Sequence, residues 1–380
     1  MRIKTIPVVL LAICLCAGAF FATNTGRMQG YALEQANAVR QVTDMRGKMV
    51  IVPNNPQRVA VFDKGFLLQC MAAMRVTNKL ALTGGLAEAP EERQDIIFLC
   101  PQILELPHAG YPGEGVDYEA LRAVKPDLVL LRRYDTLHNS EETQELINTL
   151  EEWNIPLVVL DAPAFNEEGT VETQYQGIRL LGEVFGVKER AEEVRWLMNR
   201  YINEVEGRTE NSAEKDAKPA AYLTVTAGGS AAEVWGRDFG SARFAFLHAN
   251  IQNALTVSRC ATMSSEEIAA MNPGAIILCP GFAEANPLAI LQNPAFSGVE
   301  AVQNKRVVSV GTLTRDGDFG IEIASVLMIS AKNAYPKDFE DIPLYDWLND
   351  YHRALYGITV EEAEQLKALQ GLSWMDEIGF

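Results

Sequence analysis

Histidine is scarce in this sequence, which has four in 380 residues. The four stand far apart and show none of the short spacings of a metal site: His108, His138, His248 and His352. Basic residues are also in short supply, because 33 Lys and Arg face 50 Asp and Glu, and the formal net charge is −17. A chain this acidic repels nucleic acid, so nucleic-acid binding is excluded.

The motifs of common enzyme classes are missing as well. No G-x-x-x-x-G-K-[ST] loop is present to hold phosphates, and Gly228 and Gly229 do not continue as a dinucleotide fingerprint. The stretch "GGSAA" at 228–232 lacks the closing glycine of a nucleophile elbow. We therefore expect no enzymatic activity and no cofactor.

Only one segment, at the N-terminus, approaches the length of a membrane-spanning helix. Residues 1–22 place two basic residues before an apolar run that ends in small residues, which is the pattern of an export signal. An uncleaved membrane anchor is the alternative. Cys14 and Cys16 also raise lipid modification, which the bulky Ile13 and Leu15 disfavour.

Outside this leader the cysteines fall two to each half of the chain: Cys70, Cys100, Cys260 and Cys279. Export would place them in an oxidising compartment, where disulfides Cys70–Cys100 and Cys260–Cys279 are conceivable. Buried thiols are the alternative, because Cys279 ends an apolar strand and spacing alone cannot fix connectivity.

The sequence does contain two series of alternating strands and helices. A chain of 380 residues, 48% hydrophobic, is too long for one comfortable core, so two lobes are expected. In the first series a hairpin around 44–47 precedes strands at 58–62, 80–84, 127–131 and 156–162, with helices near 65–76, 117–124 and 141–152. This alternation predicts a parallel sheet covered by helices.

A sustained helical pattern from 171 to 206 separates the two series, and Gly186 divides it into two helices. The second series has strands at 221–227, 275–281 and 306–310, helices near 238–249 and 264–271, and C-terminal helices from about 317. The predicted organisation is a leader at 1–38, an N-terminal lobe at 39–186, a linker helix at 187–207 that ends at Gly207, and a C-terminal lobe at 208–380.

One short sequence pattern occurs twice, as "YEALRAVKPDLVLL" at 118–131 and "SEEIAAMNPGAIIL" at 265–278. Each copy predicts a helix, a proline that ends it and a strand that enters the middle of a sheet. Each also places a glutamate, Glu119 or Glu266, in the first helical turn. An acidic residue there is common for helix-dipole reasons alone.

Basic and aromatic residues recur just after the expected strands, in a chain that is acidic elsewhere. They are Lys64, Phe66, Arg132, Arg133 and Tyr134 in the first lobe, and Trp235, Arg237, Phe282 and Arg315 in the second. Open parallel sheets bind ligands at the carboxyl ends of their strands. These residue types suit a flat or conjugated anionic ligand. The alternative for any single arginine is an ion pair with a nearby carboxylate such as Asp135 or Asp316.

Five segments, in order, resemble the solute-binding proteins of ABC importers for ferric siderophores, haem and vitamin B12: "VTDMRGKMVIVPNNPQRVAVF", "YEALRAVKPDLVLL", "SSEEIAAMNPGAIIL", "NPAFSGVEAVQNKRVVSV" and "YHRALYGI". The resemblance extends over most of residues 41–358, with the binding domain at about 58–340. The resemblance implies an α/β fold of two Rossmann-like lobes with parallel sheets, joined by a single long helix, with the ligand in the cleft between the lobes.

The same resemblance implies a monomeric periplasmic protein that binds a small-molecule metal chelate and delivers it to a permease dimer in the inner membrane. In that family a glutamate on each lobe docks into permease arginines, and the matching positions here are Glu119 and Glu266. We expect a ferric siderophore or similar iron chelate as ligand, with haem or cobalamin as alternatives. A nitrogenase-like two-lobe cofactor protein or enzyme is the rival from another class.

Overall fold

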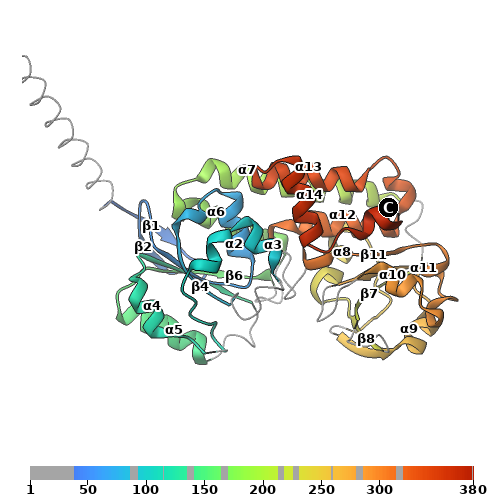
Figure 1. The fold of residues 1–380 in the computed structure, drawn as a ribbon, viewed down its shortest axis with the longest axis horizontal. Coiled ribbons are helices and arrows are strands. Elements are labelled where there is room, and N and C mark those ends of the chain that lie inside the picture. The colour runs from blue at the N-terminus through green and yellow to red at the C-terminus, as the bar shows by residue number, and fades with distance from the viewer. Residues whose placement is uncertain are drawn as a thin grey trace, which may run out of the picture.

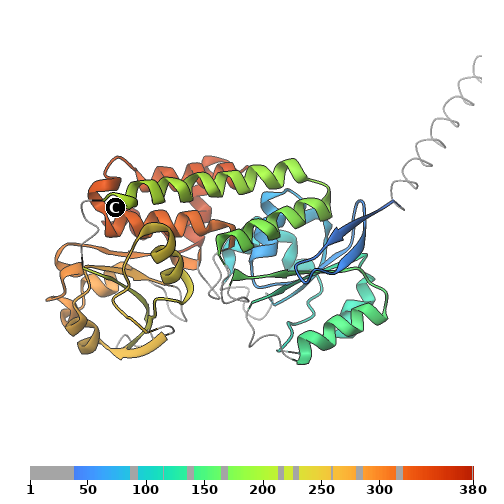
Figure 2. The same ribbon diagram turned by 180° about the vertical axis from the view of Figure 1, so that it is seen from behind.

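The computed structural model describes residues 38–85, 93–113, 115–134, 141–163, 170–212, 218–225, 231–257, 260–279, 286–313, 320–378 and 380. These residues form two α/β lobes that lie side by side, with one long helix running along both (Figures 1 and 2). This is the fold class that the sequence predicts. The expected export signal lies outside the described residues.

The N-terminal lobe is built on a parallel sheet of four strands in the order β4-β3-β5-β6. The strands are β3 (Val59–Phe62), β4 (Leu80–Gly84), β5 (Leu128–Arg133) and β6 (Leu157–Asp161). The helices are α2 (Phe66–Ala73), α3 (Gln94–Leu99), α4 (Tyr118–Val124), α5 (Glu141–Glu152) and α6 (Val171–Phe185). Nearly every strand residue is buried, which is why these strands read as unbroken apolar runs.

A separate antiparallel hairpin, β1 (Val39–Thr43) and β2 (Met49–Pro53), precedes this sheet as expected. It is tied to β6 by a hydrogen bond from the Met45 amide to the Val159 carbonyl, 3.0 Å long.

The C-terminal lobe contains a sheet of five strands in the order β11-β10-β7-β8-β9. Three of them, β7 (Ala220–Val225), β10 (Ala275–Leu278) and β11 (Val307–Ser309), are parallel, as predicted. The other two, β8 (Ala231–Trp235) and β9 (Cys260–Ser264), were not predicted. Strand β8 pairs antiparallel with both β7 and β9, so this sheet is mixed rather than purely parallel.

Helices cover both faces of this second sheet and complete the lobe. They are α8 (Gly240–Ala249), α9 (Ser265–Met271), α10 (Pro287–Leu291), α11 (Glu300–Gln303), α12 (Ile323–Ala334), α13 (Leu344–Tyr356), α14 (Val360–Leu369) and α15 (Trp374–Ile378), with a short 3-10 turn, η7 (Gly320–Glu322), before α12. Among the residues that the structure describes, no helix is both long and apolar enough to cross a membrane.

The linker helix is α7 (Lys188–Glu210), which spans both lobes (Figure 1). Gly186 separates it from α6, as predicted, by adopting a left-handed conformation with φ 70°. The prediction that Gly207 ends the helix is wrong, because α7 continues to Glu210. Val205 and Thr209 on either side are buried, and their burial outweighs the cost of a glycine in a helix, about 1 kcal/mol.

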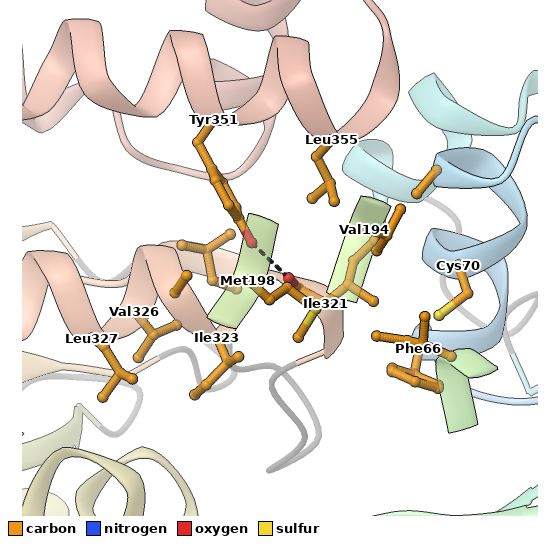
Figure 3. Close-up of a cluster of buried hydrophobic side chains, with 14 of the residues drawn as sticks. Phe66, Cys70, Val194, Met198, Ile321, Ile323, Val326, Leu327, Tyr351 and Leu355 are labelled. Carbon is orange, nitrogen blue, oxygen red and sulfur yellow. Dashed lines mark hydrogen bonds between the residues drawn. The ribbon is translucent and has the colours of Figure 1, made fainter. Parts of the chain in front are cut away.

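One hydrophobic core is shared by the two lobes and α7. Figure 3 shows its centre, where side chains from α2, α7, η7, α12 and α13 meet: Phe66, Cys70, Val194, Met198, Ile321, Ile323, Val326, Leu327, Tyr351 and Leu355. The Tyr351 hydroxyl also donates a 2.9 Å hydrogen bond to the Ile321 carbonyl. Because these residues are all buried, the lobes are joined by packing as well as by chain connection.

The four cysteines outside the leader are thiols in this structure, and three of them, Cys70, Cys100 and Cys279, are buried. Burial raises the pKa of the Cys100 thiol to about 12, so it stays protonated at neutral pH. The disulfides that the spacing leaves open are therefore not formed here.

Candidate ligand-binding site

The carboxyl ends of β3 and β5 bring several of the predicted residues together. These strands are parallel neighbours, with Phe62 beside Leu131, so the residues that follow them share one edge of the sheet. We name Asp63, Lys64, Phe66, Arg132 and Tyr134 the strand-end cluster. The Tyr134 hydroxyl accepts a 2.7 Å hydrogen bond from the Lys64 amide, which fixes the two strand ends to each other.

Arg132 is the buried centre of the strand-end cluster, with 0% of the residue exposed. Its guanidinium carbon lies 3.7 Å from the centroid of the Phe66 ring and 5.6 Å from that of Tyr134. One terminal nitrogen donates to the Gln174 side chain of α6 at 3.1 Å. The sequence predicts that this strand ends at residue 131, before Arg132. In the structure β5 continues for two more residues and ends at Arg133.

Asp63, which sequence reasoning missed, is the carboxylate of the strand-end cluster. It accepts hydrogen bonds from the Gly65 and Leu67 amides at 2.8 and 2.7 Å, and from the Tyr134 hydroxyl at 2.6 Å. Burial raises the pKa of Asp63 above its ordinary value, and the positive charge of Arg132 opposes that rise. Asp63 thus satisfies two amides at the start of α2 and orients Tyr134.

Lys64 is half-buried at the rim of the strand-end cluster. Its ammonium lies 5.4 Å from the centroid of the Tyr111 ring, and the Tyr111 hydroxyl donates a 2.6 Å hydrogen bond to the Arg132 carbonyl. Tyr111 was also missed from the sequence, because it follows no strand. Cation and aromatic faces therefore alternate at this edge, an arrangement that can bind an anion with a flat apolar part.

Arg133 has a partner within the protein. Its guanidinium forms two hydrogen bonds, of 2.7 and 3.0 Å, with the carboxylate of Asp161 at the end of β6. Burial raises the pKa of Asp161, and the bonds from Arg133 oppose this. The structure thus shows for Arg133 an ion pair with Asp161, the kind of contact that was the alternative to ligand binding. Asp135 lies outside the described residues.

The C-terminal lobe places Trp235 and Arg237 differently from the sequence prediction. Val225, the last residue of β7, pairs with Ala232 at the start of β8, and Leu223 pairs with Val234. Strand β8 therefore runs back toward the amino end of β7, and the residues after it lie at the opposite edge from the carboxyl ends of β7, β10 and β11. The expectation that Trp235 and Arg237 follow a parallel strand is wrong.

The surroundings of these two residues agree with that placement. Trp235 is buried against Phe239, with ring centroids 5.2 Å apart, and its carbonyl accepts a 2.8 Å hydrogen bond from Asn253. The Arg237 side chain is 53% exposed and pairs with Asp238 at 3.3 Å. The remaining predicted site residues, Phe282 and Arg315, lie outside the described residues.

The repeated pattern forms the same structure in both lobes. Helix α4 leads through Lys125 into β5, and α9 leads through Asn272 into β10, with φ of 47° at both C-cap residues. Both strands lie inside their sheets, as predicted. Helices α4 and α9 lie on the side of their lobes away from α7 (Figures 1 and 2).

The two glutamates of this pattern are exposed and do not cap their helices. Asp117 caps α4 by accepting from the Ala120 amide at 2.9 Å, and Ser264 and Glu267 form a capping box at the start of α9. Among the described residues, neither the Glu119 nor the Glu266 side chain makes a hydrogen bond or ion pair. Capping therefore does not explain why both positions are acidic.

No three His, Cys, Asp or Glu side chains of the described part of the chain converge as a metal site. A family model described as "Periplasmic binding protein" matches residues 72–312. The chain belongs to this family. It is accordingly a periplasmic substrate-binding protein that works with an ABC importer, and not an enzyme, which excludes the nitrogenase-like rival.

Individual relatives agree with this assignment. The molybdate-binding protein MolA of Haemophilus influenzae is 24% identical over 352 residues, which are 84% of this chain and 92% of MolA. The structure of MolA bound to molybdate has a TM-score of 0.66 at 20% identity, covering 84% of this chain and 98% of MolA.

Two Veillonella parvula structures are also similar. A periplasmic solute binding protein has a TM-score of 0.70 at 21% identity, covering 89% of this chain and 100% of its own. The TroA-like periplasmic binding protein FepB has a TM-score of 0.68 at 16% identity, covering 84% and 97%. These likenesses confirm the two-lobe fold.

Proposed function

We propose that this periplasmic binding protein captures a small anionic metal compound between its lobes and delivers it to the permease of an ABC importer. The strand-end cluster carries the proposal, because it gathers Lys64 and Arg132 among aromatic rings in a chain with a net charge of −17. An iron chelate such as a ferric siderophore is our first candidate, because its anionic oxygens match the half-buried Lys64 ammonium and its conjugated rings match the half-buried ring of Tyr134. Haem and cobalamin, metal compounds bound within the same family of proteins, are alternatives.

A metal oxyanion is the second candidate, favoured by the likeness to MolA over 84% of the chain. Molybdate is small and fully polar, so it would contact the half-buried Lys64 ammonium at the rim of the strand-end cluster and leave the aromatic rings without a ligand contact. The two candidates therefore differ in what they require of the aromatic residues.

Melting temperatures of the purified protein, measured with a panel of compounds, test the proposal. The panel contains a ferric tris-catecholate, haem, cobalamin and molybdate, with sulfate as the control anion. Bound ligand stabilises the folded state by about 2.7 kcal/mol when present at about 100 times its Kd, which raises the melting temperature measurably. A rise with the ferric chelate supports the first candidate, and a rise with molybdate alone supports the second. If no compound raises the melting temperature, the proposed ligand class is wrong.

Replacing Lys64 with alanine is expected to weaken binding of the stabilising compound by about tenfold, because it removes a half-buried cation at the strand ends. The matched control is Arg237→Ala, which removes an exposed cation at the far edge of the other sheet. It should change the affinity by less than about twofold. Equal losses in the two variants, measured by titration calorimetry, would contradict the proposed position of the site.

We also propose that Glu119 and Glu266 dock this protein onto the permease. Both are exposed, both start helices on the side away from α7, and neither serves its own helix as a cap. The experiment for this part of the proposal is argued in the Discussion.

A further inference from the structure

A series of hydrogen bonds connects the strand-end cluster with the C-terminal lobe. The first residue of this series is Arg93, which contacts the backbone of Lys64. Arg93 is buried before α3, where one terminal nitrogen donates to the Lys64 carbonyl and the Nε donates to Asp95 at 3.3 Å. The adjacent Gly65 makes room for it, because a Cβ there would stand 2.8 Å from the Arg93 guanidinium. Arg93 thereby fixes the backbone that carries Lys64.

Asp95 continues this series across the boundary between the lobes. One carboxylate oxygen accepts from Arg93, and the other accepts a 3.2 Å hydrogen bond from the hydroxyl of Thr312. Asp95 belongs to α3 of the N-terminal lobe and is 2% exposed, whereas Thr312 follows β11 of the C-terminal lobe. A buried carboxylate of one lobe is thus satisfied by a hydroxyl of the other.

Thr312 is itself held firmly in the C-terminal lobe. Its amide donates a 2.9 Å hydrogen bond to the Gln370 carbonyl, and the Gln370 side chain donates to the buried Glu322 at 3.0 Å. Gly311 has φ +52° and lies so close to the Gln370 carbonyl that a Cβ would come within 1.9 Å of its oxygen. The hydroxyl of Thr312 is therefore presented to Asp95 from a fixed backbone.

We propose that Asp95 is a positioning residue of the ligand site, which sets the Lys64 strand end relative to the C-terminal lobe through Arg93 and Thr312. The inference rests on the proposed function, since it concerns a ligand held by both lobes. The Asp95–Thr312 bond joins groups that come together only when the lobes have one particular separation. Without this hydrogen bond the lobes also adopt separations in which a ligand contacts one lobe alone. The apparent affinity then falls in proportion to the fraction of molecules in the binding-competent state.

Conservative substitutions of Thr312 test the inference. Valine has nearly the shape of threonine but lacks the hydroxyl, and serine keeps the hydroxyl but lacks the methyl group. Thr312→Val is expected to weaken binding of a ferric tris-catecholate, or of molybdate run in parallel, by about tenfold, the value of one hydrogen bond to a charged group. The loss should appear as faster dissociation. Thr312→Ser should bind within about twofold of the wild type.

The matched control is Thr209→Val. The Thr209 hydroxyl is also buried and hydrogen-bonded, but to the Val205 carbonyl and Asn250 rather than across the lobe boundary. This variant should lose stability and keep its affinity within about twofold. If Thr209→Val weakens binding as much as Thr312→Val does, or if Thr312→Ser fails to restore it, the effect is general destabilisation and the inference is overturned.

A second measurement does not depend on any ligand. Spin labels on exposed helix positions of the two lobes, Glu145→Cys in α5 and Gln303→Cys in α11, report the distribution of distances between the lobes by pulsed dipolar spectroscopy. Cys260, the half-buried native thiol, is replaced by serine in this background. Thr312→Val should broaden the distribution and Thr312→Ser should not.

The two measurements separate failure of the inference from failure of the proposed function. A broadened distribution without binding of any panel compound would support the positioning contact and reject the ligand class. A distribution and an affinity that are both unchanged in Thr312→Val would overturn the inference and leave the proposed function standing.

Discussion

Replacing Glu322 with alanine is expected to lower the free energy of unfolding by about 3–5 kcal/mol, because it removes one member of a buried charged network. Glu322 is fully buried at the end of η7, where it accepts from the Tyr356 hydroxyl at 2.7 Å and from Gln370 at 3.0 Å. Its second oxygen lies 2.8 Å from Nε2 of His352, which is also fully buried. Alanine would leave three polar groups in the core without an acceptor.

The charge of Glu322 matters as much as its shape. Burial holds the pKa of Tyr356 well above its usual value, and the negative charge of Glu322 raises it further, so the tyrosine stays protonated and donates. Glu322→Gln keeps the shape but brings a second amide against the one of Gln370. It should therefore lose less stability than Glu322→Ala and more than a surface variant.

Urea denaturation of the wild type, Glu322→Ala and Glu322→Gln measures these differences in the free energy of unfolding. Glu300→Ala is the surface control. Glu300 pairs with Lys218 at 2.7 Å, and both side chains are over one-third exposed. Its loss should cost about 0–1 kcal/mol. A cost of that size for Glu322→Ala would mean that water replaces the carboxylate, and that the network does not stabilise the lobe junction.

The elements that could be predicted from the sequence are those whose signal is local. The strands of the N-terminal sheet are buried on both faces, so they appear as unbroken apolar runs between helices. Helix α7 has a sustained helical period, and Gly186 ends the helix before it by a conformation that glycine favours. The repeated pattern was found because its proline and apolar strand occur in the same order in both lobes.

The elements that were missed are those whose signal lies in tertiary contacts. Strand β9, "CATMS", is half-exposed and carries no apolar run, and β8 contains a glutamate. Without β8 the chain direction at Trp235 could not be known, and Trp235 and Arg237 were assigned to the wrong edge of the sheet. Tyr111 comes to the strand ends from a loop. Asp63 directly follows β3 and lies two residues before Gly65, and that position could have suggested that it accepts from amides at the start of α2.

If Glu119 and Glu266 dock the protein onto the permease as proposed, reversing both charges, Glu119→Lys with Glu266→Lys, is expected to abolish uptake in cells while ligand affinity and melting temperature change little. A monomeric binding protein has one such helix on each lobe, and two equivalent halves of a permease dimer would meet one each. The two contacts act together, because the first makes the second intramolecular, so losing both has a far larger effect than losing one. The shared core around α7 limits how far the two helices can move apart.

The rival explanation is that these glutamates only complement the dipoles of their helices, and a matched variant decides between the two. Glu172 in α6 and Glu361 in α14 are likewise exposed glutamates in the first turns of helices, and reversing both changes the net charge by the same amount. Uptake should persist in Glu172→Lys with Glu361→Lys and disappear in Glu119→Lys with Glu266→Lys. Docking is the one role whose loss would impair transport while leaving binding and stability intact. Glu119 and Glu266 are therefore not docking residues if both double variants transport alike, or if Glu119→Lys with Glu266→Lys also loses ligand affinity.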